Sequence, residues 1–161
     1  MSRIIDWARL AAGCAICCAL LQVVPGDRCA AQTAPAYVGS NACKDCHGAE
    51  YESYQSRAKK AHSYDSITKM EAHLTPTELR QCYECHTTGY GRPGGFRSEE
   101  ETPDLRNAGC EVCHGPGSRH VQSARAGDIR GKVTVADCEV CHNPERVEVF
   151  KYKPLVYSGG H

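Results

Sequence analysis

The chain has 161 residues, and its 19 Lys and Arg are balanced by 19 Asp and Glu, so the formal net charge at neutral pH is zero. This balance excludes the basic excess with which proteins bind nucleic acid. From Gln32 onward only seventeen of 130 residues are Leu, Ile, Val or Phe, about 13%, whereas chains below roughly 20% rarely form an ordinary core. Folding therefore needs a further apolar component.

The N-terminus has the pattern of a secretory signal. Residues 1–9 are a short basic start, residues 10–24 are an almost wholly apolar run, and a Pro-Gly pair and small residues follow before Gln32. We predict a signal peptide over residues 1–31 and one domain over residues 32–161. A membrane-spanning helix needs about 20 apolar residues, so an uncleaved anchor is the weaker interpretation. We expect export to the periplasm, the cell surface or the extracellular space, with no stable membrane anchor after cleavage.

The mature part is predicted to be mostly α. Residues 48–69 are rich in helix formers, and apolar side chains recur on one face at intervals of three and four. Residues 75–78 read as a capping box with Pro at the first helical position, which opens a short helix into Cys82. Residues 87–107 are a long loop bounded by Gly and Pro, and only residues 147–152 alternate as a strand would. The residues on the helical face are Tyr51, Tyr54, Ala58, Ala61 and His62.

The pattern CxxCH occurs four times and uses all eight cysteines of the mature part. Two residues between the cysteines let both sulfurs form thioethers with one porphyrin, and the adjacent His becomes the proximal iron ligand. Disulfides and zinc sites are the competing interpretations, but neither explains a His after every second Cys. The motifs predict four covalently bound haem c groups, whose apolar surface completes the core. The attachment cysteines are Cys43, Cys46, Cys82, Cys85, Cys110, Cys113, Cys138 and Cys141, and the proximal histidines are His47, His86, His114 and His142.

Four further histidines match the four irons that need a second axial ligand. The distal candidates are His62, His73, His120 and His161. Met70 is the only Met beyond the initiator, so Met/His ligation applies to at most one haem and the haems are predicted to be mainly bis-histidine. His120 lies six residues after His114, too short a path to reach the opposite face of the same iron. His120 must therefore serve another haem.

Three segments together resemble the cytochrome c-554 family of tetrahaem electron carriers. They are Tyr-Val-Gly at 37–39, Cys-His-Thr-Thr-Gly at 85–89, and the sequence GCEVCHGPGSRH from 109 to 120. The resemblance implies short helices and long loops wrapped around four stacked haems, with little β structure.

The same resemblance implies crossed ligation, in which His120 serves the haem of His47 and His62 serves the haem of His114. In the best-known member the second haem lacks a distal side-chain ligand. In this chain His73, thirteen residues before His86, is a candidate for that position.

Three functions follow from this pattern. The leading hypothesis is an electron carrier, not an enzyme, that passes electrons between redox protein partners in the periplasm or outside the cell. The second is a small reductase of nitrogen oxides or hydroxylamine at one five-coordinate haem, against which the surplus of His argues. The third is a subunit of an extracellular cytochrome filament, in which His161, after Gly159 and Gly160, is donated across the subunit boundary.

Overall fold

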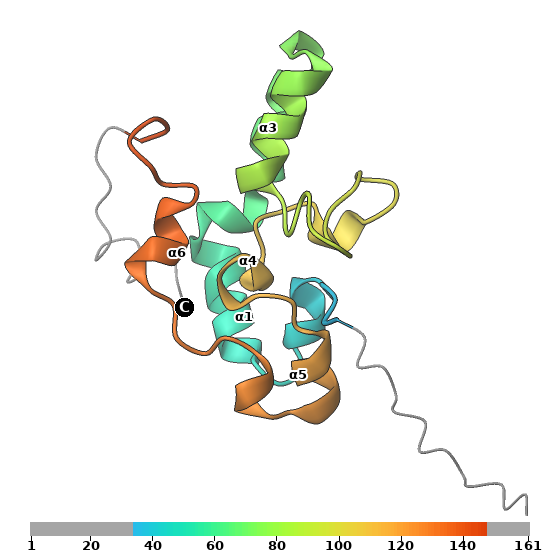
Figure 1. Ribbon diagram of the computed structural model, residues 1–161, viewed down its shortest axis with the longest axis vertical. Coiled ribbons are helices and arrows are strands. Elements are labelled where there is room, and N and C mark those ends of the chain that lie inside the picture. The colour runs from blue at the N-terminus through green and yellow to red at the C-terminus, as the bar shows by residue number, and fades with distance from the viewer. Residues whose placement is uncertain (1–33, 148–161) are drawn as a thin grey trace, which may run out of the picture. The chain divides into compact units, whose positions relative to one another are not determined.

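The computed structural model describes residues 34–147. This part of the chain consists of short helices joined by loops and contains no β-strand (Figure 1). The predicted mostly α fold is therefore confirmed. The expectations for the signal peptide (1–31), for His161 and for all but the first residue of the strand at 147–152 lie outside the described residues.

Six α-helices and five single-turn 3₁₀ helices make up the described part. The α-helices are α1 (Gly48–Arg57), α2 (Tyr64–Met70), α3 (Pro76–His86), α4 (Cys110–His114), α5 (Ser118–Ser123) and α6 (Val135–Glu139). The 3₁₀ helices are η2 (Ser40–Cys43), η3 (Lys59–His62), η4 (Glu71–His73), η5 (Pro103–Leu105) and η6 (Ala126–Asp128). The second CxxCH motif closes α3, the third is α4, the fourth begins in α6, and the first bridges η2 and α1.

The single helix expected over residues 48–69 is wrong in one respect, because the chain breaks at Ala58. Ala58 has extended backbone angles, φ −88° and ψ 114°, and η3 follows it. The break lets Tyr54, Ala58 and Ala61 form one buried cluster, as the predicted face requires. His62, at the end of that face, is exposed.

The capping box predicted at residues 75–78 is confirmed. Glu78 N donates to Thr75 Oγ1 at 3.3 Å, and Thr75 N donates to Glu78 Oε2 at 2.8 Å. Pro76 follows as the first helical residue. These bonds satisfy backbone donors that every helix N-terminus leaves without a partner, and α3 then runs into the second motif.

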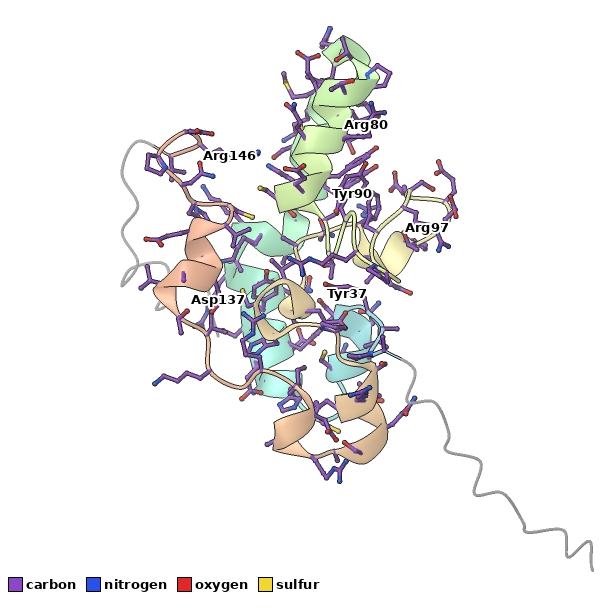
Figure 2. All side chains as sticks on the ribbon, viewed as in Figure 1. Tyr37, Arg80, Tyr90, Arg97, Asp137 and Arg146 are labelled. Carbon is purple, nitrogen blue, oxygen red and sulfur yellow. The ribbon has the colours of Figure 1, made fainter. Side chains whose placement is uncertain are left out.

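The larger buried cluster joins α2 to the long loop after α3. Tyr64, Ile67, Phe96 and Leu105 form it, and Tyr83 packs on Tyr64 with ring centres 6.3 Å apart and nearly parallel. Tyr90 lies against Tyr83, with ring centres 5.3 Å apart (Figure 2). So few buried apolar side chains agree with the low apolar content of the sequence.

The loop over residues 87–107 is present as predicted, and its start is closely packed. Thr87 and Thr88 are 1% and 2% exposed. Gly89 has φ +72°, and a Cβ there would lie 2.6 Å from the Tyr37 ring, so the backbone conformation and the close contact both require glycine. Within residues 34–147 no helix has the length and apolar character needed to cross a membrane.

Candidate haem-attachment site

The four CxxCH motifs meet in two pairs. The side chains of Cys43 and Cys110 interact, which raises the pKa of the Cys43 thiol and lowers that of the Cys110 thiol, so the first motif lies beside the third. Burial and the side chain of Cys85 raise the pKa of the Cys141 thiol, so the second motif lies beside the fourth. The eight cysteines of the described part are free thiols.

An ion pair supports the contact between the second and fourth motifs. Arg146 Nη2 lies 3.8 Å from Glu84 Oε2, and Glu84 stands between the two cysteines of the second motif. Capping residues hold the fourth motif from its other side, because Asp137 accepts from Thr134 N at 2.9 Å and pairs with Arg130 (Figure 2). The fourth motif is thus attached both to α3 and to the segment that follows α5.

Two of the predicted proximal histidines donate Nδ1 to a backbone carbonyl oxygen. His86 Nδ1 donates to Ser63 O at 2.8 Å, and His114 Nδ1 donates to Arg130 O at 2.7 Å. A carbonyl oxygen can only accept, so Nδ1 carries the proton and, in the neutral imidazole, Nε2 is the unprotonated nitrogen. Metal-ligating histidines almost always have such a bond, and these two residues fit the role of axial ligand.

The structure brings His120 to His47, as the crossed pattern implies. Their ring centres lie 6.0 Å apart with the planes tilted by 30°, and His120 Nδ1 donates to Arg125 O at 2.9 Å. Metal–imidazole bonds are about 2.0 Å long and the ring centre lies roughly 1.1 Å beyond Nε2, so two imidazoles on one metal have centres about 6 Å apart. The spacing fits an iron held between these two residues.

The other distal candidates are placed differently. His62 Nε2 donates to Gln55 O at 2.9 Å, so this atom would have to exchange that bond for a metal. His73 is exposed and ends η4, just before α3 begins, whereas His86 ends α3. The rise of this eleven-residue helix is about 15 Å, so His73 and His86 stand at opposite ends of it (Figure 1). The ligand roles of His62, His73 and His161 remain predictions.

A cavity of about 330 Å³ brings three motifs together. It is lined by His86 of the second motif, Cys113 of the third and His142 of the fourth, and by the cations Lys60 and Arg146. Burial, together with Lys60, lowers the pKa of His142, which favours the neutral imidazole that metals bind. Cations at the wall match the acidic propionates of a porphyrin, so the residues present fit haem.

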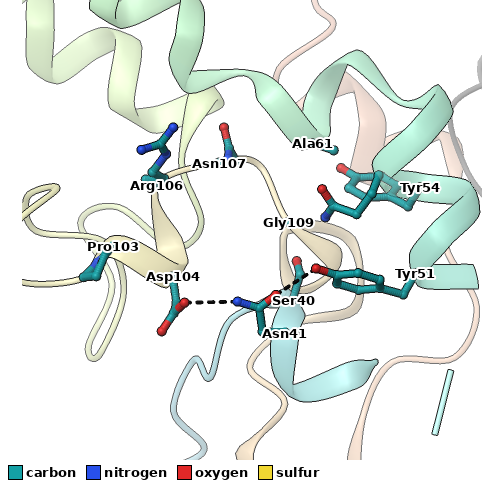
Figure 3. A pocket seen from close by; sticks show the side chains of 11 residues that line it. Ser40, Asn41, Tyr51, Tyr54, Ala61, Pro103, Asp104, Arg106, Asn107 and Gly109 are labelled. Atoms are coloured by element: carbon teal, nitrogen blue, oxygen red, sulfur yellow. Dashed lines mark hydrogen bonds between the residues drawn. The ribbon is translucent and has the colours of Figure 1, made fainter. Parts of the chain in front are cut away.

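A second, smaller cavity of about 170 Å³ has a different character (Figure 3). Tyr51 Oη donates to Asn41 Oδ1 at 2.8 Å, and Asn41 Nδ2 donates to Asp104 Oδ1 at 3.3 Å. These polar groups satisfy one another across η2, α1 and η5. Nearby, Tyr54 Oη donates to Ala108 O at 2.5 Å. The hydrogen bonds around this cavity therefore attach α1 to the loop before the third motif.

Sequence analysis missed Glu111, the residue after the first cysteine of the third motif. It is 2% exposed, and its carboxylate accepts hydrogen bonds from the backbone of Val38, Gly39 and Gly117. The fourth motif has the same five-residue sequence, yet its Glu139 is exposed. The pentapeptide alone does not distinguish the two, and the tertiary structure reveals the role of Glu111.

Comparisons with known proteins show which family the sequence resembles. The family model described as "Cytochrome c554 and c-prime" matches residues 42–115, which include the first three motifs. The predicted resemblance to the cytochrome c-554 family is confirmed. Cytochrome c-554 of Nitrosomonas europaea is 33% identical over an alignment of 115 residues that covers 65% of this chain and 48% of that protein. The chain thus spans about half the length of this relative. No solved structure matches the chain.

Proposed function

We propose that this chain is an exported tetrahaem c-type cytochrome that carries electrons between redox protein partners. The observation that carries the proposal is the pairing of the motifs, in which Cys43 lies beside Cys110 and Cys85 beside Cys141. Groups attached to adjacent sulfurs are near one another, and short separations are what electron tunnelling requires. The haems, when bound, supply the one-electron chemistry.

The chain's own residues hold and orient these groups. The eight motif cysteines provide the thioether attachments, and four histidines provide proximal ligands. Ser63 and Arg130 orient His86 and His114 through backbone carbonyls. The spacing of His47 and His120 supports bis-histidine ligation for the haem of the first motif. The signal peptide proposed at residues 1–31 would direct the protein to the periplasm or the cell surface, and its cleavage would leave the mature chain.

Mass spectrometry and turnover measurements test this function. After acid–acetone extraction, which removes non-covalent haem, the mature protein should still carry four haem additions. Three or fewer would contradict at least one attachment site. The reduced protein should donate electrons once per haem to a redox partner and show no steady-state consumption of nitrite or hydroxylamine.

A second candidate function is favoured by the position of His73. His73 stands at the far end of α3 from His86. His73 is therefore too far away to be the distal ligand of the haem of the second motif. An open iron would allow the reductase activity. Multiple turnovers with nitrite or hydroxylamine, abolished by carbon monoxide, would establish the reductase and reject a pure carrier.

A further inference from the structure

Glu111 is the one acidic side chain among the buried residues of the described part. Gly117 N lies 2.6 Å and Val38 N 3.1 Å from its Oε1, and Gly39 N lies 2.8 Å and Val38 N 3.1 Å from its Oε2. Each of these partners is a backbone N–H donor, so both oxygens act as acceptors. A buried carboxylate is tolerated when charge-assisted bonds replace its water, and this set of bonds suits the ionised form.

These bonds join the segments that lead to the first motif and to His120. Val38 and Gly39 precede η2 and the first motif, whereas Gly117 precedes α5, which carries His120. Two further bonds support the same contact, because Ala36 N donates to Ser118 Oγ at 2.8 Å and Ser118 N donates to Ala36 O at 3.1 Å. The Glu111 carboxylate therefore joins the segment before the first motif to the segment before α5, and this contact places His120 beside His47.

The carboxylate also lies close to the third motif. Glu111 follows Cys110 directly and precedes His114 by three residues in α4, a spacing that places side chains on neighbouring positions of one helix face. Since the group is buried, solvent screens its charge poorly. A fixed negative charge stabilises the ferric state, which carries one more positive charge than the ferrous state.

We infer that Glu111 is a positioning residue that holds an ionised carboxylate between the first and third motifs and so lowers the reduction potentials of the haems attached there. The inference rests on the proposed function, because it requires haem at these two motifs. It goes beyond that function by naming a protein charge that sets the potentials of one pair of haems and leaves the other pair unaffected.

The fourth motif supplies a matched control. Glu139 occupies the same position in the same sequence, CEVCH, but is exposed, so water and salt screen its charge. The holoproteins of wild type, Glu111→Gln and Glu139→Gln should each be titrated potentiometrically, with visible spectra and the mass of attached haem recorded. In Glu111→Gln we expect a positive shift of one or two of the four midpoint potentials while four haems stay attached. In Glu139→Gln all four should stay at the wild-type values.

A second variant separates the charge from the shape of the bonded contact. Glu111→Asp keeps the charge but shortens the side chain, so its potentials should stay near those of wild type even if its stability falls. Potentials in Glu111→Gln equal to wild type would overturn the inference. A positive shift in Glu111→Asp would also overturn it, whether or not Glu111→Gln yields holoprotein. Wild-type protein without haem at the first or third motif would instead overturn the proposed function.

Discussion

Ser63 and His86 are joined by two hydrogen bonds. His86 Nδ1 donates to Ser63 O at 2.8 Å, and Ser63 Oγ donates to His86 O at 2.8 Å. Ser63 Oγ also accepts from Ala108 N at 2.9 Å. One serine between two helical segments thus orients the proximal histidine of the second motif and attaches the loop before the third.

Removing this hydroxyl should cost stability but not ligation. In Ser63→Ala the carbonyl bond to His86 Nδ1 remains, while Ala108 N and His86 O each lose a partner. We expect a loss of about 1–3 kcal/mol in the free energy of unfolding, measured by denaturant titration of the holoprotein, and unchanged visible and EPR spectra. Ser66→Ala, at an exposed position, is the control and should change neither. A new high-spin signal in Ser63→Ala would show that the hydroxyl itself supports ligation.

The pair of His47 and His120 predicts a spectroscopic change. Loss of a distal imidazole opens an iron and raises its potential, because nitrogen donation to the ferric state is lost. In His120→Ala one of the four haems should become high-spin, and the EPR spectrum of the oxidised protein measures this directly. An unchanged low-spin spectrum would mean that the 6.0 Å ring spacing serves packing alone.

His73 should behave in the opposite way. It is exposed and stands at the end of α3 away from His86. Across one iron, two histidine Cα atoms lie no more than about 13 Å apart, whereas the rise of α3 alone is about 15 Å. We expect His73→Ala to leave the number of high-spin haems as it is in wild type. Appearance of one additional high-spin haem would show that α2 and α3 rearrange when haem is attached.

Local chemistry explains which features the sequence could predict. The capping box at Thr75 and Glu78 involves residues three apart, so its bonds can be inferred from spacing alone. The CxxCH motifs are likewise local. The break at Ala58 is different, because Ala and Lys around it favour helix and only the packing of Tyr54 against Ala61 opposes a continuous one.

Sequence analysis missed the residues whose roles arise from contacts between distant parts of the chain, because spacing reveals only local contacts. Glu111 and Glu139 share one pentapeptide, and their burial differs because residues 36–39 cover only the first of them. Ser63 was not recognised either, since its partners are 23 and 45 residues away. The position of His73 depends on α3 continuing unbroken to His86, and the sequence indicated this helix only as far as Cys82.

The capping box makes a measurable contribution to α3. Thr75→Ala removes the oxygen that accepts from Glu78 N, and the loss of such a cap costs about 1 kcal/mol. Denaturant unfolding of the holoprotein should show a loss of that size. Thr77→Ala is the control, because the Thr77 hydroxyl accepts only from exposed Arg80, at 3.1 Å, and its removal should change stability little. Equal losses in both variants would show that the cap is not responsible for the loss, since helix propensity favours Ala over Thr.

Thr88 and Thr87 form a pair that separates a long-range bond from a local one. Thr88 Oγ1 donates to Asn107 O at 2.6 Å and accepts from Gly109 N at 2.9 Å, which holds the residue directly before the third motif. Thr87 Oγ1 donates at 2.6 Å to Tyr83 O, a carbonyl that already accepts from Thr87 N. Both side chains are buried, so replacement by Val preserves their shape and removes only the hydroxyl.

The two replacements should therefore differ in cost. Thr88→Val leaves a partly buried donor and a partly buried acceptor without the threonine hydroxyl as partner, and we expect a loss of about 2–3 kcal/mol in the free energy of unfolding. Thr87→Val leaves Tyr83 O with its backbone partner, so its loss should be about 1 kcal/mol or less. Haem content measured by mass should be the same in both, because no attachment residue changes. If the two variants lose equal stability, the bonds from Thr88 to Asn107 and Gly109 do not hold the third motif in place. The close contact of Tyr37 with Gly89 would then be the alternative source of that attachment.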